Sequence, residues 1–191
     1  MNTVSTSLYT FKNFTDLTVP ESDEVLQGRN DPHVRRWMTS DLPIDADDHQ
    51  HFMNGLKTNH KALYIRIERA GRFVGVYSLN DLVDASALGG FWVTAHARDR
   101  LLALNVVFHG MNYMFRDQGI RRIYGCQKQG NQSAIRLNAL LGLYSSEPPA
   151  TNGDGMQQIE ITRHQWEQKT VQDVKLLKLM ERMEKLNGTT E

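Results

Sequence analysis

Two arginines lie between an apolar run and a helical pattern in the middle of the chain. Residues 91–94 form a short apolar and aromatic stretch, and the polar residues 95–100, which include Arg98 and Arg100, follow directly. A loop that leads into a helix places several backbone N–H groups and the positive end of the helix dipole at one point. The spacing therefore predicts a phosphate-binding loop with two arginines as additional cations.

The elements around this loop follow from the periodicity of the apolar residues. From Leu101 onward they recur every three or four positions, which predicts a helix that Gly119 ends with a left-handed cap. A strand is expected over 120–126, and the next helix should begin near Asn131 and end at Gly142. The predicted order is strand, loop, helix, strand, helix.

The rest of the chain supplies further strands and helices. Strands are expected over 8–14, 62–68, 72–79 and 156–162, and helices over 21–27 and 45–56, with residues 1–7 outside the sheet and residues 81–88 as a connection. Ala70-Gly71 is a tight-turn signal between the second and third of these strands, and Gly89-Gly90 can mark a bulge in the central strand. The chain should thus form one sheet with helices around it.

Composition limits the class of protein. At 191 residues the chain is long enough for one domain, and we expect that domain over 1–169 and a helical tail over 170–191. Lys plus Arg and Asp plus Glu number 22 each, so no global positive charge supports nucleic-acid binding. No apolar run approaches the ~20 residues of a membrane span, and a cytoplasmic protein is expected.

The single cysteine and the C-terminal tail have simpler interpretations. Cys126 cannot form an internal disulfide, and its place in a predicted strand suggests a small buried side chain. The tail carries one apolar stripe that must be covered by its own domain or by a second subunit, so a homodimer is possible. The stripe comprises Val171, Val174, Leu177, Leu179 or Met180, Met183 and Leu186.

This order of elements resembles the GNAT acetyltransferase superfamily, in which the loop after the fourth strand binds the pyrophosphate of acetyl-CoA. There the loop usually reads Arg or Gln, two residues, Gly, one residue, then Gly or Ala, and residues 98–103 match at both ends. A second family signature is matched by Asn131, Ala134, Gly142 and Leu143. The resemblance implies an α/β (α+β) GNAT fold. Its central sheet is mixed, mostly antiparallel and twisted, has about six to seven strands, and is flanked by helices, here with an extra C-terminal helix.

The resemblance also implies acetyl-CoA as co-substrate. The positions that it assigns to acetyl-CoA are Trp92, Val93, Arg98, Asp99, Arg100, Leu101, Leu102, Ala103, Asn131 and Arg136. No metal is expected, because His49 and His51 are two residues apart on a predicted helix and point to different faces.

A narrower resemblance covers the front half of the chain. Its pattern is similar to that of the N-acetyltransferases that modify amino sugars in the pseudaminic acid pathway, and it comprises Arg29-Asn30, Pro32, Met38, Asp47-Asp48, His49 and Phe52. This likeness implies that Arg29, Met38 and His49 bind a nucleotide-linked amino sugar. Two plainer readings stay open, in which Arg29 pairs with Asp31 and His49 is a partly exposed helix residue.

The sequence departs from the family pattern at two functional positions. Leu101 stands where the loop has its central glycine, which allows the backbone to approach the pyrophosphate. Asn138 stands where the family commonly has a tyrosine that protonates the leaving thiolate, and an amide cannot do so. Tyr144 is a candidate substitute for the acid. His49, Asp47 or Asp48, directly or through water, is a candidate for the base.

Three functions therefore remain open. The first is an N-acetyltransferase that acts on a small amine, possibly a nucleotide-linked amino sugar. The second is an acyltransferase whose donor is an acyl carrier protein, with Arg98 and Arg100 facing its acidic surface. The third is a degenerate binding or regulatory module that keeps the fold without the reaction.

Overall fold

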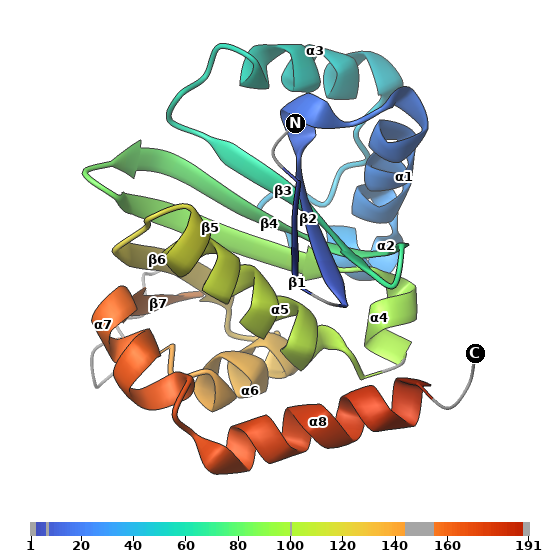
Figure 1. Ribbon diagram of the computed structural model, residues 1–191. Coiled ribbons are helices and arrows are strands. Elements are labelled where there is room, and N and C mark those ends of the chain that lie inside the picture. The colour runs from blue at the N-terminus through green and yellow to red at the C-terminus, as the bar shows by residue number, and fades with distance from the viewer. Residues whose placement is uncertain (1–2, 7, 100, 144–154, 189–191) are drawn as a thin grey trace.

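A single seven-stranded sheet forms the centre of the molecule (Figure 1). The computed structural model describes residues 3–6, 8–99, 101–143 and 155–188. The strands are β1 (Thr3–Thr6), β2 (Tyr9–Asn13), β3 (Leu63–Arg69), β4 (Arg72–Val83), β5 (Ser86–Val93), β6 (Arg122–Lys128) and β7 (Met156–Thr162). They lie side by side in chain order, and every neighbouring pair is antiparallel except β5 and β6. The predicted fold class is therefore confirmed.

Helices cover both faces of this sheet (Figure 1). They are α1 (Val19–Asn30), α2 (Pro32–Arg35), α3 (Ala46–Leu56), α4 (Ala95–Asp99), α5 (Ala103–Asn112), α6 (Gln132–Leu140), α7 (Arg163–Gln165) and α8 (Val174–Gly188). On one face α1 and α3 pack on a small core that contains Val25, Met53 and Val76. On the other face α5, α6 and α8 pack on the larger core. None of these helices is long and apolar enough to cross a membrane, in the ranges that the structure describes.

Two tight hairpins set the register of the middle strands. Ala70 and Gly71 join β3 to β4, as the sequence predicts, with φ of 48° and 75°. Asp84 and Ala85 join β4 to β5 with φ of 48° and 60°. Two positive φ angles in a two-residue loop match the twist of antiparallel strands. The expected connection over 81–88 is therefore wrong, because its residues belong to β4, a turn and β5.

The position of the bulge also differs from the expectation. The register between β4 and β5 runs unbroken through Gly89 and Gly90, and it shifts instead between Asn80 and Val83, where Asp81 has a φ of 51°. The two glycines thus do not mark a bulge. At the N-terminus, β1 pairs with β2, so residues 3–6 belong to the sheet rather than lying outside it.

The C-terminal helix docks on its own domain. Leu176 and Met180 are buried in the larger core, and Leu179 and Met183 pack against it. The predicted stripe was partly wrong, because Val174, Leu177 and Leu186 are exposed. The division of the chain at residue 169 stays a prediction.

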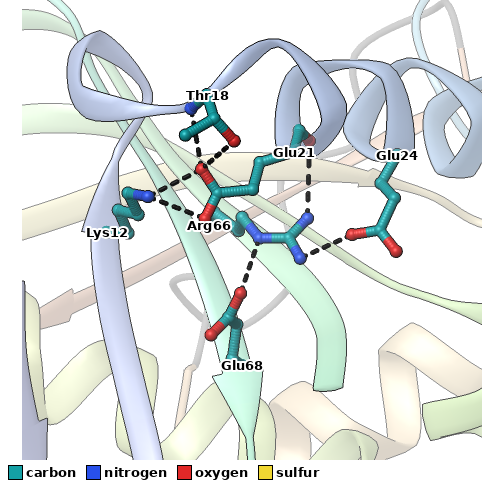
Figure 2. A network of polar contacts seen from close by, with 6 residues as sticks. All are labelled: Lys12, Thr18, Glu21, Glu24, Arg66 and Glu68. Carbon is teal, nitrogen blue, oxygen red and sulfur yellow. Dashed lines mark hydrogen bonds and ion pairs between the residues drawn. The ribbon is translucent and has the colours of Figure 1, made fainter. Parts of the chain in front are cut away.

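One buried arginine ties α1 to the sheet (Figure 2). Arg66 on β3 is 3% exposed, and its guanidinium donates to Glu24 at 2.6 Å, to Glu68 at 3.0 Å and to the carbonyl of Glu21 at 3.4 Å. It also lies 4.2 Å from the centre of the Phe73 ring. A buried charge is tolerated when its donors are satisfied in this way, so the network fixes α1 over β3.

A second ion pair holds the start of the same helix. Lys12 on β2 donates to both carboxylate oxygens of Glu21, at 2.6 and 2.7 Å, and the Thr18 N–H donates to that carboxylate at 2.7 Å (Figure 2). Burial favours the protonated form of Glu21. Hydrogen bonds from Lys12 and Thr18 outweigh that effect and lower the pKa of the carboxyl from 4.5 to about 2.

Replacement of Lys12 by Met should therefore destabilise the protein in a pH-dependent way. A lowered carboxyl pKa contributes stability above the unfolded-state pKa of 4.5, and this contribution is lost as the pH falls toward about 2. The Lys12→Met variant should thus melt below the wild type at pH 7, and the gap should close between pH 4.5 and 2. Thermal unfolding over this pH range measures it, with exposed Lys57→Met as control. A gap that stays constant with pH would contradict the assignment.

Candidate functional site

The sheet opens between β5 and β6. These parallel strands pair at only three positions, Ser86 with Arg122, Ala87 with Ile123, and Leu88 with Tyr124. Beyond that point β5 continues to Val93 and β6 to Lys128 without pairing to each other. The sheet therefore contains a V-shaped opening whose walls are the C-terminal halves of two strands.

The backbone of β5 presents unpaired polar groups to this opening. The Thr94 N–H donates to the Val74 carbonyl at 3.0 Å, so even-numbered residues of this stretch face β4. Because backbone groups of successive residues in a strand point to opposite sides, those of Phe91 and Val93 face β6 and the opening. An extended amide-bearing ligand can pair with them as an added strand.

Two glycines allow β5 and β6 to meet at the apex before they part. A Cβ atom on Gly89 would lie 2.4 Å from Cγ2 of Ile123, and one on Gly125 would lie 2.9 Å from the carbonyl oxygen of Gly89. Only glycine fits such close approaches. The opening thus begins at a point that these two residues define.

The predicted phosphate loop lies beside the mouth of this opening. Residues 95–99, expected as a loop, form the short helix α4, and the following helix begins at Ala103 rather than at Leu101. No side chain caps the first turn of α5, so its N–H groups are available to an anion. The exposed Arg98 pairs with Asp99 at 3.0 Å, and Arg100 lies outside the described residues.

Leu101 has a left-handed backbone conformation, which glycine adopts more easily than leucine. Its φ is +57°, and its side chain is 65% exposed. The left-handed region costs a residue with a Cβ atom about 1–2 kcal/mol. Leucine therefore occupies this turn at a cost in backbone energy, and its side chain points away from the core.

The helix after β6 carries the second set of predicted positions. Asn131 caps α6 by accepting the Ala134 N–H at 3.1 Å, and Arg136 lines a shallow surface hollow with Ala139 and Leu140. Asn138 is buried and donates to Gln127 at 2.6 Å. Asn138 thus joins β6 to α6. Tyr144 lies outside the described residues.

The segment between α1 and α3 spans the opening on the other face of the sheet. Gly28, at the end of α1, lies so close to the Trp92 side chain on β5 that a Cβ atom would be 2.9 Å from it. Further on, the Arg36 carbonyl accepts from Lys128 on β6 at 3.0 Å, and Trp37 lies near Gly130. Residues 28–37 therefore reach from one wall of the opening to the other.

This spanning segment contains two neighbouring arginines with unused donors. Arg29 donates to the Ser40 carbonyl at 3.3 Å and Arg35 to the Asp41 carbonyl at 2.7 Å. Yet Nη1 of Arg29 and Nε of Arg35 are buried without a hydrogen-bond partner. Burial of the guanidinium lowers the pKa of Arg29, and the nearby positive charge of Arg35 lowers it further. Two such cations with spare donors form a site that an anion would satisfy.

The other two residues that were predicted to bind the acceptor substrate, His49 and Met38, lie in different surroundings. His49 is 8% exposed, and its Nε2 lies 2.9 Å from Oγ of Ser22, so the ring packs between α3 and α1. Burial lowers the pKa of His49, against the opposing effects of Ser22 and Asp23. Met38 follows α2 and is half-buried. Roles for His49 and Met38 in binding stay predictions.

Several polar groups near the opening were not singled out from the sequence. Arg35 was missed because only the fold brings it beside Arg29. The Ser78 hydroxyl donates to the Gly90 carbonyl at 3.3 Å, and the Tyr64 hydroxyl donates to Asn80 at 2.9 Å. Cys126 is exposed, so its predicted burial is wrong. It lies on β6 beyond the last pairing with β5, where one neighbour is missing.

The part of the chain that the structure describes holds no group of three or more His, Cys, Asp or Glu side chains placed to bind a metal ion.

Comparison with known sequences identifies a family that contains this chain. The sequence model of the family described as acetyltransferase (GNAT) domain matches residues 15–143. This range includes the opening, the phosphate loop and the arginine pair. None of the curated protein sequences matches the chain significantly.

Solved structures share the fold at low sequence identity. Spermidine N-acetyltransferase from Vibrio cholerae, in complex with CoA and spermine, has a TM-score of 0.71 and 14% identity, over 84% of this chain and 99% of that one. RimJ from Mycobacterium smegmatis, in complex with CoA-disulfide, has a TM-score of 0.70 and 18% identity, over 91% and 90%. The N-acetyltransferase PseH from Campylobacter jejuni, in complex with acetyl coenzyme A, has a TM-score of 0.62 and 14% identity, over 81% and 99%.

Leu101→Gly should leave the protein equally stable or stabilise it by up to about 1 kcal/mol. Glycine removes the cost of the left-handed conformation, and its greater freedom in the unfolded chain offsets part of that gain. Leu140→Gly is the matched control, because Leu140 is also exposed but belongs to the regular helix α6. That change should cost about 0.5–1 kcal/mol. Denaturant unfolding compares the two, and equal losses would show that the turn at Leu101 is not strained.

Proposed function

The chain belongs to the acetyltransferase (GNAT) domain family and is an acyltransferase, and on that premise we propose that it acetylates the amine of a small anionic acceptor with acetyl-CoA. The single observation that carries the proposal is the opening between β5 and β6, because it presents unpaired backbone groups to an extended thioester ligand. A nucleotide-linked amino sugar is the acceptor that we favour.

The donor would be held along β5 and at the start of α5. The amides of its pantetheine arm can pair with the backbone of Phe91 and Val93 in the manner of an added strand. Its pyrophosphate would meet the uncapped N–H groups in the first turn of α5, where the helix dipole also favours negative charge. Arg136 and the hollow on α6 offer a further surface for the nucleotide end.

The chemistry requires one bond to form and one to break. The neutral amine attacks the carbonyl carbon of the thioester, the C–S bond breaks, and the acetyl group remains on nitrogen. A backbone N–H of Phe91 or Val93 can donate to the oxygen on which negative charge develops, and such a fixed donor lowers the barrier. The amine gives up one proton in this process, and the thiolate takes one up.

The reaction also needs a general acid for the thiolate and a general base for the amine. Asn138 cannot supply the proton for the thiolate, and its amide already bonds Gln127, so we retain Tyr144 as the acid. Burial lowers the pKa of His49 and so favours the neutral ring, the form that a base requires. Its ring nitrogen faces Ser22, which makes a relay through that hydroxyl or a water the plausible route.

The arginine pair supports an acceptor that carries a negative group as well as an amine. Arg29 and Arg35 have buried donors that a phosphate or diphosphate would satisfy, and they would repel a polycation. The half-buried Trp37 and Met38 lie on the same segment and offer apolar surface to a base or a deoxysugar. Spermidine, the acceptor named for the structural neighbour from Vibrio cholerae, lacks the anionic group.

The other functions have weaker support. A carrier-protein donor would need exposed cations beside the loop. Of the two arginines expected there the structure describes only Arg98, whose charge Asp99 offsets at 3.0 Å. A degenerate binding module would not require an open β5 edge together with an uncapped α5. A cytoplasmic location and a homodimer stay predictions.

A panel of amines, assayed by thiol release from acetyl-CoA, tests the proposal. Nucleotide-linked 4-amino sugars should be acetylated faster than free amino acids, peptides or polyamines. Arg29→Met and Arg35→Met should each raise the Michaelis constant for that acceptor about tenfold, since a charge-assisted hydrogen bond is lost, and leave acetyl-CoA affinity unchanged. Exposed Arg116→Met is the matched control and should change neither constant.

The results separate the parts of the proposal. A polyamine or peptide as best substrate, or no effect of the two arginines, would refute the anionic acceptor and leave acetyl transfer standing. Absence of acetyl-CoA binding by calorimetry, together with no turnover of any amine, would refute acetyl transfer itself.

A further inference from the structure

The C-terminal helix packs against the turn that would hold the pyrophosphate. Leu176 and Met180 of α8 belong to the same buried cluster as Leu102 and Leu104, which flank the start of α5. Figure 1 shows α8 crossing beneath α5 at this end. α8 lies beyond residue 143, where the family match stops. Its contacts with α5 lie at the helix start that would hold the pyrophosphate.

Polar contacts fix this crossing more specifically than the apolar ones. The side-chain amide of Asn105, in the first turn of α5, donates to Glu184 at 2.8 Å and to the Met180 carbonyl at 3.2 Å. Asn105 is 1% exposed. Both acceptors lie on α8, so a single side chain joins the two helices.

Glu184 in turn is held by the sheet. Its carboxylate accepts from the Tyr9 hydroxyl on β2 at 2.5 Å and from Arg69 on β3 at 2.8 Å. His109, one turn beyond Asn105, stacks on the Tyr9 ring at 4.4 Å. Oδ1 of Asn105 is buried without a hydrogen-bond partner, so the two bonds from the amide nitrogen carry the connection. Through Glu184 this polar cluster ties α5 to the sheet.

The turn next to Asn105 is the one that carries backbone strain. Leu101 has a φ of +57°, and its neighbours fix it through the bonds from Leu101 N–H to Arg98 and from Leu102 N–H to Ala97, at 3.0 and 2.8 Å. A strained conformation persists only when the structure around it holds it in place. Leucine needs such support at this position far more than glycine does.

We propose that Glu184 is a positioning residue for the donor site: through Asn105 it holds the strained turn at Leu101 in the geometry that binds the pyrophosphate. The inference rests on the proposed function, since it concerns the same acetyl-CoA site. α8 thereby compensates for the loss of glycine at position 101. Glu184 itself touches no substrate.

Glu184→Gln tests this, because it keeps the size of the side chain and removes the charge that Arg69 and Asn105 bind. We expect the Kd for acetyl-CoA to rise about tenfold and the Michaelis constant for the acceptor to stay unchanged. Amide hydrogen exchange should accelerate at Leu101 and Leu102, whose N–H groups are hydrogen-bonded to the Arg98 and Ala97 carbonyls. Glu181→Gln is the matched control, because Glu181 lies on the same helix and pairs with exposed Lys185 at the surface. It should change none of the three.

A second substitution links the effect to the strained turn. In a Leu101→Gly background, Glu184→Gln should raise the Kd less than twofold, because glycine adopts the turn without help. If Glu184→Gln does not fold, Asn105→Ala breaks the same connection and leaves Glu184 bound to Tyr9 and Arg69, with the same expected results.

Each outcome decides the inference. Unchanged exchange at Leu101 and Leu102 overturns it, whether or not acetyl-CoA binds. Faster exchange with unchanged affinity also overturns it, because α8 then supports the fold alone. An equal loss of affinity with leucine and with glycine at position 101 overturns the link to strain. Failure of the wild type to bind acetyl-CoA refutes the proposed function, and the exchange result then decides whether Glu184 holds the turn.

Discussion

The site depends on one constraint, that two parallel strands pair at their beginnings and separate afterwards. Gly89 and Gly125 allow β5 and β6 to touch at the apex, since a side chain at either position would meet the other strand at under 3 Å. Beyond the apex, the unpaired backbone of β5 would be costly if it were buried without a partner. The sheet therefore offers a place where an extended ligand completes the hydrogen bonding that the protein leaves open.

The helices beside the opening are held to the sheet by ion pairs of buried arginines. Arg66 anchors α1 over β3, and α1 carries Gly28 and Arg29 to the edge of the opening. On the opposite face, Glu184 connects α8 with β2, β3 and α5. Because a buried charge loses much when its partner moves, each pair favours one position of its helix. The positions of these helices thus require charged side chains to be buried, which costs free energy.

Local signals predicted much of this structure. Periodicity identified α3, α5 and α6, and glycines with positive φ at Gly119 and Gly142 end helices as expected. The hairpin at Asp84-Ala85 was missed because neither residue is glycine or asparagine, which are the usual signals. The exposure of Cys126 and the proximity of Arg35 to Arg29 depend on which segments meet in space. A sequence pattern does not show which segments these are. The stripe on α8 was misplaced because apolar residues occur on two sides of that helix.

The central claim is that Phe91 and Val93 present free backbone groups to the donor. Amide hydrogen exchange, resolved for single residues by NMR with and without acetyl-CoA, tests it most directly. The account predicts that acetyl-CoA slows exchange strongly at Phe91 or Val93 and changes it little at Gly90 and Trp92, whose N–H groups already face β4. Protection that is absent from β5, or equal at all four residues, would contradict a donor bound along this strand.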